Sequence, residues 1–152
     1  MSDVNILIVD DEKDMRTGLQ RVLNRKIPLT STTICSGADE ALEIIQDRSF
    51  DLALLDIKME GMSGLDLLAE LREADPWITV IMMTGYGTIE MAVEAIRGGA
   101  YDFISKPFDN DTLCRVVGKG LERNRLIREN HFLRQKVKKA GKDIGFVGSS
   151  PA

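Results

Sequence analysis

Three aspartates stand where two apolar runs of the sequence end. Asp10 and Asp11 follow the run at 4–9, and Asp56 closes the run at 52–55. Such runs, bounded by charged residues and followed by a glycine-containing loop, are typical of short buried strands. If the strands are parallel neighbours, the three carboxylates meet at one edge of a sheet. Like charges that close raise one another's pKa, so the cluster favours a hard divalent cation, most simply Mg²⁺.

Two further residues could act in the same chemistry. Thr84 follows a predicted strand at 77–83, and Lys106 follows another at 100–104. A lysine ammonium and a threonine hydroxyl can each hold one phosphoryl oxygen, and a carboxylate such as Asp56 can attack the phosphorus. Taken singly these residues are ordinary, because aspartates often end strands and Lys-Pro usually forms a turn. The prediction depends on their combination.

The elements that must position these residues alternate along the chain. Capping pairs, Ser36 with Asp39 and Ser63 with Asp66, open two predicted helices. Strands are predicted at 4–9, 30–35, 51–56, 77–83 and 100–104, and helices at 12–25, 36–46, 63–75, 88–97 and from about 111 onward.

Five apolar strands alternating with helices predict an α/β fold, a doubly wound five-stranded parallel sheet with helices on both faces. In such sheets the site lies beyond the carboxyl ends of the strands. All the candidate residues fall at those ends, which is the strongest argument in the sequence.

Charge is divided unevenly along the 152 residues. Residues 1–114 hold 10 Lys and Arg against 21 Asp and Glu, a net charge of −11, whereas residues 115–152 hold 10 against 3, a net charge of +7. An acidic body with a basic tail indicates two functional segments. No apolar run approaches a membrane span, the N-terminus lacks a signal-peptide pattern, and Cys35 and Cys114 lack metal-ligand spacing. We therefore expect a cytoplasmic protein with ordinary buried thiols and no membrane partner.

In this order and at this spacing, the candidate residues resemble the receiver domain of two-component response regulators. The likeness covers roughly residues 3–122 and rests on Asp10-Asp11, Asp56, Thr84-Gly85 and Lys106-Pro107-Phe108. It implies a flavodoxin-like sheet of strand order 2-1-3-4-5. It also implies that Asp56 takes a phosphoryl group from a phosphohistidine on a sensor histidine kinase. Such a protein is a phosphoacceptor with self-catalysed transfer and slow hydrolysis, not an enzyme in the usual sense.

The resemblance further implies how a metal is held. Mg²⁺ would be bound by Asp11, Asp56 and the backbone carbonyl of Lys58, with Asp10 binding directly or through water. A cis Lys106-Pro107 peptide would aim the lysine side chain at the site.

A conformational switch is implied as well. Thr84 would move toward the phosphoryl group, and Phe103 would turn into the vacated space; a core position for Phe103 fits the sequence equally well. From their positions, Lys58 and Gly85 are expected to tune the lifetime of the phosphoryl group.

The last predicted helix continues to about residue 139. Leu126, Asn130, Leu133 and Val137 recur at spacings of four, three and four, which is typical of a coiled-coil seam with a polar register-setting residue. This predicts a homodimer through the linker helix, to which the resemblance adds the face of helix four, strand five and helix five. The alternative is a solvated linker helix. Because the basic residues lack aromatic interleaving or a recognition-helix pattern, we expect no direct DNA binding here. His131 is predicted to be structural and exposed.

The final residues, 145–152, are similar to the opening of the central ATPase module of sigma-54-dependent transcription activators of the nitrogen-regulator family. This order implies a receiver domain at 1–122, a helical linker and possible coiled coil at 123–142, and the start of a truncated ATPase module at 143–152. The implied function is phosphorylation-dependent control of dimerisation and of a downstream transcription-activating ATPase with DNA-binding domains. No GxxxxGK phosphate loop is present.

Two other functions occur on this kind of fold. A Mg-dependent aspartyl phosphatase would carry its nucleophile on the first strand with a second aspartate two residues later, whereas Asp10 and Asp11 are adjacent. A flavin or nucleotide binder would offer glycines and hydroxyls after the first strand, where residues 11–14 are mostly acidic. The pair of glycines in Gly85-Tyr86-Gly87 is only half a nucleotide motif.

Overall fold

The computed structural model describes residues 4–85 and 89–144. Within these residues five strands alternate with five helices, as predicted. In chain order they are β1 (Val4–Val9), α1 (Lys13–Lys26), β2 (Thr30–Cys35), α2 (Ala38–Ile45), β3 (Leu52–Asp56), α3 (Gly64–Ala74), β4 (Thr79–Thr84), α4 (Ile89–Arg97), β5 (Asp102–Ser105) and α5 (Asn110–Ile144). The half-motif glycine Gly87 and the predicted first residue of the fourth helix, Thr88, lie outside the described residues.

All five strands are parallel, in the order β2-β1-β3-β4-β5. This confirms the predicted sheet. β1 pairs with β2 on one side and with β3 on the other, and the direction in which strands are added to the sheet reverses between β1 and β3. The carboxyl ends of these two strands therefore flank the topological switch point. The register pairs Val9 with Leu55 and Asp56 with Met83, which places the ends of β1, β3 and β4 side by side.

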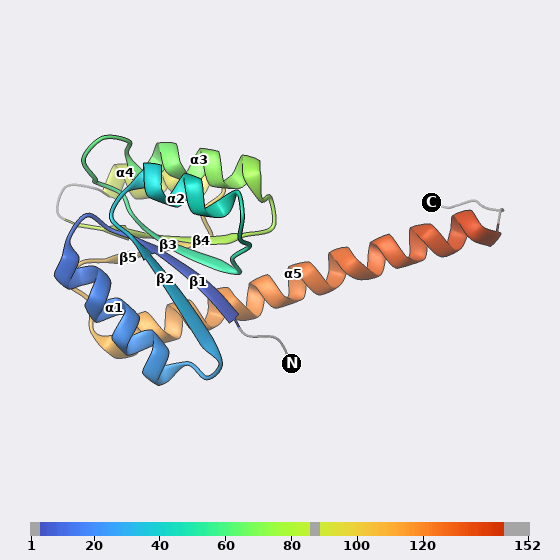
Figure 1. Ribbon diagram of the computed structural model, residues 1–152, viewed down its shortest axis with the longest axis horizontal. Coiled ribbons are helices and arrows are strands. Elements are labelled where there is room, and N and C mark those ends of the chain that lie inside the picture. Colours follow the sequence, from blue (N-terminus) through green and yellow to red (C-terminus); the bar gives the residue numbers. More distant parts are fainter. Residues whose placement is uncertain (1–3, 86–88, 145–152) are drawn as a thin grey trace.

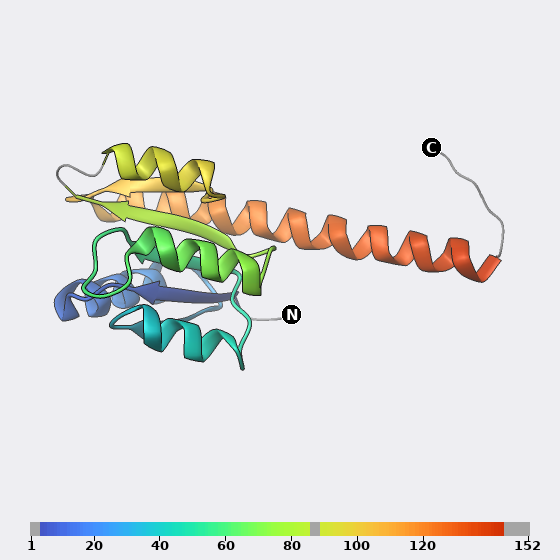
Figure 2. The same ribbon diagram turned by 90° about the horizontal axis from the view of Figure 1, so that it is seen from above.

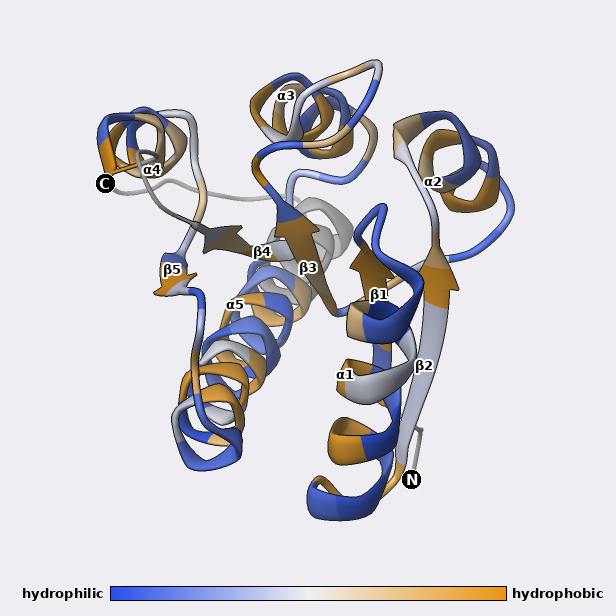
Figure 3. Ribbon diagram, turned by 90° about the vertical axis from the view of Figure 1, so that its left-hand side faces the viewer, coloured by the Kyte–Doolittle hydropathy of each residue, from blue (hydrophilic) through white to orange (hydrophobic). Residues whose placement is uncertain are grey.

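Helices cover both faces of the sheet, as Figure 3 shows end-on: α1 and α5 lie on one side and α2, α3 and α4 on the other. Alternate residues of each strand point to opposite faces. Ile6, Ile8 and Leu54 therefore belong to the core under α1 and α5, while Leu7 and Leu55 belong to the core under α2, α3 and α4. Because both faces of the sheet are buried at its centre, β1, β3 and β4 are largely apolar instead of alternating, whereas the edge strands β2 and β5 carry polar residues.

One predicted helix cap is confirmed and the other is wrong. Ser63 caps α3, and its hydroxyl accepts a hydrogen bond from the Asp66 N–H at 3.2 Å. The helix α2 is instead preceded by Gly37, with no side-chain cap bond. Ser36 lies one residue too early, and its N–H and hydroxyl both donate to the Glu40 carboxylate. Ser36 therefore bonds to Glu40 and not to Asp39, the residue with which the sequence pattern paired it.

Two strands begin later than predicted because the preceding residues complete turns. Trp77 donates its N–H to the Asp75 carboxylate at 3.0 Å, in the turn that follows α3, and β4 starts only at Thr79. Gly99 adopts a φ of +110° after α4, and the Ala100 N–H donates to Ala95 at the helix end. The helix α4 thus ends at a glycine, and β5 starts two residues later than expected.

The final helix is longer than predicted and extends far beyond the sheet. Figures 1 and 2 show α5 leaving the body at the end opposite the carboxyl ends of the strands. Asp109 stands at its start and accepts the Thr112 N–H at 2.7 Å. On the projecting part, Leu126 and Leu133 are 52% and 54% exposed. A coiled-coil seam here stays a prediction, since these side chains have no cover within the described single chain.

The base of this helix is fixed to the body by two polar side chains. Asn124 is buried and donates to the Trp77 carbonyl at 2.7 Å. Arg128 donates to the Phe50 carbonyl at 3.0 Å and pairs with Asp75 at 3.3 Å. Packing of the helix against the body of the protein therefore reaches at least residue 128, inside a helix that is continuous across the predicted division at 122/123. No helix of the described residues is both long and apolar enough to cross a membrane.

The two cysteines differ in burial, which predicts their order of reaction with thiol reagents. Burial, helped by the charge of Glu40, raises the pKa of Cys35 to about 12, and burial raises the pKa of the half-buried Cys114 to a smaller extent. Because the thiolate is the reactive form, Cys114 should be alkylated first at pH 8 in the folded protein. Mass spectrometry of Cys114→Ala should then show slow labelling that accelerates only on unfolding. Rapid labelling of that variant would contradict the burial argument.

Candidate functional site

Three aspartates meet at the carboxyl ends of β1 and β3. Asp10 and Asp11 directly follow β1, and Asp56 is the last residue of β3. One ligand oxygen from each carboxylate lies within 4.8 Å of the other two. Asp10 is fully buried and Asp56 is 8% exposed, whereas Asp11 is exposed. The parallel register thus brings Asp10 and Asp11 together with Asp56, which is 46 positions after Asp10 in the sequence.

The lysine after β5 reaches into this cluster. Its ammonium nitrogen lies 3.0 Å from Asp10 Oδ2 and 3.4 Å from Asp56 Oδ2. Lys106 precedes a cis peptide bond to Pro107, as expected, and its N–H donates to the Thr84 carbonyl. The ends of β1, β3, β4 and β5 therefore all contribute to one arrangement.

Backbone N–H groups orient each carboxylate. Asp10 Oδ1 accepts from the Glu12 N–H at 2.9 Å, and Asp56 Oδ1 accepts from the Lys58 N–H at 3.3 Å. Asp11 accepts from the Glu60 N–H at 3.3 Å, so the loop after β3 contacts the loop after β1. Lys58 thus contributes its N–H to the site, while the metal-binding role of its carbonyl stays a prediction.

A glycine that sequence reasoning missed packs against the phosphoacceptor candidate. Gly64 opens α3, and its N–H donates to the Ile57 carbonyl at 2.8 Å. A Cβ at Gly64 would lie 2.3 Å from the Asp56 carbonyl oxygen and 2.7 Å from the Ile57 Cα. No real Cβ approaches that closely, so only glycine lets α3 lie against the backbone that presents Asp56. In the sequence, the only feature that marked Gly64 was its place directly after the helix cap Ser63.

Of the two predicted switch residues, Thr84 is buried and Phe103 is exposed. Thr84 is buried, and its hydroxyl donates to the Ile104 carbonyl at 3.4 Å and lies 3.5 Å from the Ser105 hydroxyl. Within the described residues, the Thr84 hydroxyl therefore bonds toward β5 and not toward the aspartate cluster. Phe103 is 36% exposed, so the interpretation of this residue as a core phenylalanine is wrong. Only four residues form β5, at the sheet edge, which leaves this face of the strand open.

The surroundings of Asp56 raise the pKa of its carboxyl group, so that the group becomes protonated slightly below neutral pH. Burial raises the pKa of Asp56 to about 6; the charge of Lys106 opposes this and the charge of Asp10 adds to it. Burial alone would lower the pKa of Lys106, but its hydrogen bond to Asp10 and the charges of Asp10 and Asp56 outweigh burial and raise it. At pH 7 the lysine is therefore a cation and Asp56 is mostly a carboxylate.

This pKa shift predicts a pH-dependent cost of folding. In the unfolded chain Asp56 titrates near 3.8, and in the fold near 6. The stability that its protonated form contributes is complete below pH 3.8 and is lost as the pH rises through 6. When a chelator keeps divalent cations off the site, Asp56→Asn should raise the free energy of unfolding by up to about 2 kcal/mol at pH 7 but by little at pH 4. Urea unfolding of both proteins at the two pH values measures this. A difference independent of pH would contradict the assignment.

The cluster fits a hard divalent cation. Mg²⁺ takes oxygen ligands at about 2.0–2.1 Å, so its ligand atoms lie roughly 3–4 Å apart, close to the spacing that the three carboxylates offer. Lys106 offsets part of the charge at Asp10 and Asp56, and within the described residues it forms no ion pair with Asp11. Three carboxylates against one ammonium leave negative charge for a cation to neutralise.

Comparison with known proteins agrees with this geometry. The sequence profile of the response regulator receiver domain matches residues 6–118. The chain is 36% identical over 149 residues to the C4-dicarboxylate transport transcriptional regulatory protein DctD of Rhizobium meliloti, covering 97% of this chain and 32% of that protein. It is 40% identical over 144 residues to a putative response regulator NtrX-like of Rickettsia bellii, covering 90% and 29%.

Solved structures of response regulators are also similar to this chain. The receiver domain of NtrX from Brucella abortus is 44% identical with a TM-score of 0.73, covering 77% of this chain and 98% of that one. A longer NtrX structure from the same organism is 41% identical with a TM-score of 0.79, covering 99% of this chain and 32% of that one. The chain thus spans about a third of the length of these curated relatives. The resemblance stated from the sequence is confirmed: this chain belongs to the response regulator receiver domain family.

Proposed function

We propose that the chain is a phosphorylation-controlled switch in which Asp56 accepts a phosphoryl group from a phosphohistidine on a sensor histidine kinase. Response regulator receiver domains work with such kinases and generally bind Mg²⁺ in an acidic pocket. The observation that carries the proposal is the convergence of Asp10, Asp11 and Asp56 within 4.8 Å, with Lys106 reaching two of them. The protein would act as a phosphoacceptor with self-catalysed transfer and slow hydrolysis.

In the proposed transfer, an Asp56 carboxylate oxygen attacks the phosphorus of the donor. The new O–P bond forms as the N–P bond to the kinase imidazole breaks, and the electron pair of that bond returns to the imidazole nitrogen. Lys106 is placed to hold one phosphoryl oxygen through its ammonium group, and Thr84 would offer its hydroxyl to another after leaving its bond to Ile104. An anionic Asp56 is required, which its pKa of about 6 allows at pH 7.

Mg²⁺ would be held by Asp11 and Asp56, with Asp10 in support and the Lys58 carbonyl as a further ligand. When bound, the ion supplies positive charge that offsets the repulsion between the phosphoryl oxygens and the three carboxylates. The residues of the chain fix the geometry before the donor arrives, because the N–H groups of Glu12 and Lys58 already orient the carboxylates of Asp10 and Asp56.

The proposed output passes to a downstream module through α5. Relatives about three times as long include transcriptional regulatory proteins, which supports a receiver at 1–122, a linker at 123–142 and the start of a sigma-54-type ATPase at 143–152. Exposed Leu126 and Leu133 support a homodimer along the linker helix. We place the protein in the cytoplasm and assign Phe103 to the switching face with α4 and α5, where its exposure leaves it free to turn.

Dependence on Mg²⁺ tests the proposal directly. Incubation of the chain with Mg²⁺ and a small acyl phosphate donor should add one phosphoryl group, detected by intact mass. A chelator should reduce the rate of that gain at least about tenfold, since the metal stabilises charge in the transition state. Addition of excess Mg²⁺ should restore it. If no gain occurs at any Mg²⁺ concentration, the phosphoacceptor function is wrong.

A further inference from the structure

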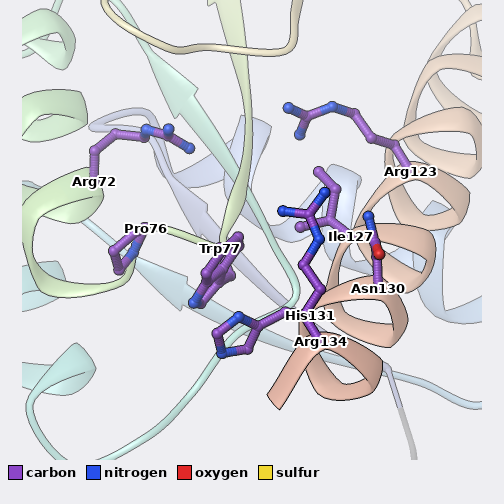
Figure 4. A pocket seen from close by; sticks show the side chains of 8 residues that line it. All are labelled: Arg72, Pro76, Trp77, Arg123, Ile127, Asn130, His131 and Arg134. Carbon is purple, nitrogen blue, oxygen red and sulfur yellow. The ribbon is translucent and has the colours of Figure 1, made fainter. Parts of the chain in front are cut away.

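A hollow of about 270 Å³ lies between the end of α3, the turn before β4 and the middle of α5. Figure 4 shows the side chains that surround it, among them Arg72, Trp77, Arg123, His131 and Arg134. It is at the end of the sheet where α5 departs, opposite the aspartate cluster. None of its residues has a part in the proposed phosphoryl transfer.

The hollow is lined by positive charge that no described carboxylate neutralises. Arg72 donates to the Ile78 carbonyl at 3.4 Å, and Arg123 donates to the Thr79 hydroxyl at 3.2 Å and lies over the Tyr101 ring. Within the described residues, neither of these arginines nor Arg134 forms an ion pair.

Neighbouring arginines on the same helix behave differently. Arg125 pairs with Glu122 and Glu129, and Arg128 pairs with Asp51 and Asp75. Carboxylates are therefore abundant around α5, and the part of the chain up to residue 114 carries a net charge of −11. Among the described residues, three guanidinium groups that form no ion pair around one hollow are a local exception, and guanidinium groups favour phosphate and carboxylate oxygens.

The hollow also has a flat apolar wall. Trp77 is 38% exposed, and its ring contacts the His131 ring in a tilted arrangement, with centroids 4.3 Å apart and an interplanar angle of 36°. Ile127 lines the same space. A planar, partly apolar group is therefore the natural occupant beside the guanidinium groups, since aromatic side chains bind flat rings by stacking.

We propose that this hollow binds a small phosphorylated ligand with a planar ring, of the nucleoside monophosphate class. The phosphate would contact the guanidinium groups of Arg72 and Arg134, and the ring would pack against Trp77. The concave shape and the small volume favour a small molecule over a flat protein partner, whose acidic surface would need a broad patch. Because the hollow is partly open to water, binding should be weak, with a dissociation constant on the order of 0.1 mM.

The test uses the fact that Trp77 is the only tryptophan of the chain. The intrinsic fluorescence of the whole chain is followed at constant ionic strength during titration with AMP, adenosine or inorganic phosphate. AMP should give a saturable change, and adenosine and phosphate should each bind at least about tenfold more weakly, since each lacks one half of the recognised group. Nuclear magnetic resonance of the Trp77 indole N–H provides a second readout that does not depend on quenching.

Matched variants separate specific binding from general attraction to basic residues. Arg72→Gln and Arg134→Gln should each weaken AMP binding about fivefold or more, whereas Arg125→Gln, on the same helix but paired with glutamates, should leave it unchanged. Thermal unfolding checks that each variant is folded. The proposal is overturned if AMP gives no saturable change, if adenosine binds as well as AMP, or if Arg125→Gln weakens binding equally. Tighter binding of a polyglutamate peptide than of AMP would also overturn it, in favour of an acidic protein partner.

Discussion

Asp56→Asn should abolish phosphoryl transfer to the chain. The asparagine amide has nearly the shape of the carboxylate but no negative charge, so it cannot act as the attacking nucleophile. Its carbonyl oxygen can still accept the Lys58 N–H, which bonds Asp56 at 3.3 Å. Intact mass after incubation with Mg²⁺ and a small acyl phosphate should show the gain of one phosphoryl group in the original protein and none in the variant.

Asp51→Asn is the matched control for this loss. Asp51 directly precedes the other end of β3, where its carboxylate accepts the Asn5 N–H at 2.8 Å and lies 3.7 Å from Arg128. It is far from the aspartate cluster, so the phosphoryl gain should persist. Equal gains in the Asp56→Asn variant and the original protein would show that another residue is the acceptor.

The same samples report on the proposed output. Light scattering on a sizing column should show a change in the dimer population only where the mass has increased, if α5 transmits the switch. Phosphorylation without any change in the column profile would keep the chemistry at Asp56 and contradict the proposed dimerisation along the helix that carries Leu126 and Leu133.

Gly64→Ala should destabilise the fold and impair phosphorylation together. The new Cβ would be 2.3 Å from the Asp56 carbonyl oxygen, and its three nearest atoms all belong to the backbone of Asp56 and Ile57, so no flexible side chain can move aside. Overpacking of this kind costs about 3 kcal/mol or more, and lowers the melting temperature by roughly 10 °C. Because α3 must move away from the residue that carries the acceptor carboxylate, we expect the phosphorylation rate to fall even at temperatures where the variant is folded. Thermal unfolding and intact mass measure the two effects.

Gly118→Ala is the control for the glycine substitution. Gly118 lies inside α5, and an added Cβ there meets nothing within 4 Å. Alanine is the better helix former, so this variant should be more stable by about 0.5–1 kcal/mol and should be phosphorylated normally. If Gly64→Ala proves as harmless as Gly118→Ala, the close approach of α3 to Asp56 does not hold in solution.

Local chemistry explains why so much of the fold and of the aspartate cluster could be predicted. The central strands β1, β3 and β4 are buried on both faces and largely apolar, so each was visible as an apolar run, and β2 was visible as a run of β-branched residues. The residue after each run had to lie at the carboxyl edge of a parallel sheet. That is enough to predict that Asp10, Asp11, Asp56 and Lys106 converge once the strands are parallel. The Ser63 cap was equally visible, because a cap depends on atoms only three residues apart.

Tertiary structure alone decided the features that depend on distant residues. The exposure of Phe103 follows from the place of β5 at the sheet edge, and no local pattern encodes that place. The requirement for glycine at position 64 comes from the approach of α3 to β3, and the anchoring of α5 by Asn124 comes from the turn before β4. The basic hollow likewise joins α3 to α5, which are 51 positions apart at Arg72 and Arg123. Such contacts depend on how helices pack on the sheet, whereas the strand ends depend only on the sequence of each strand.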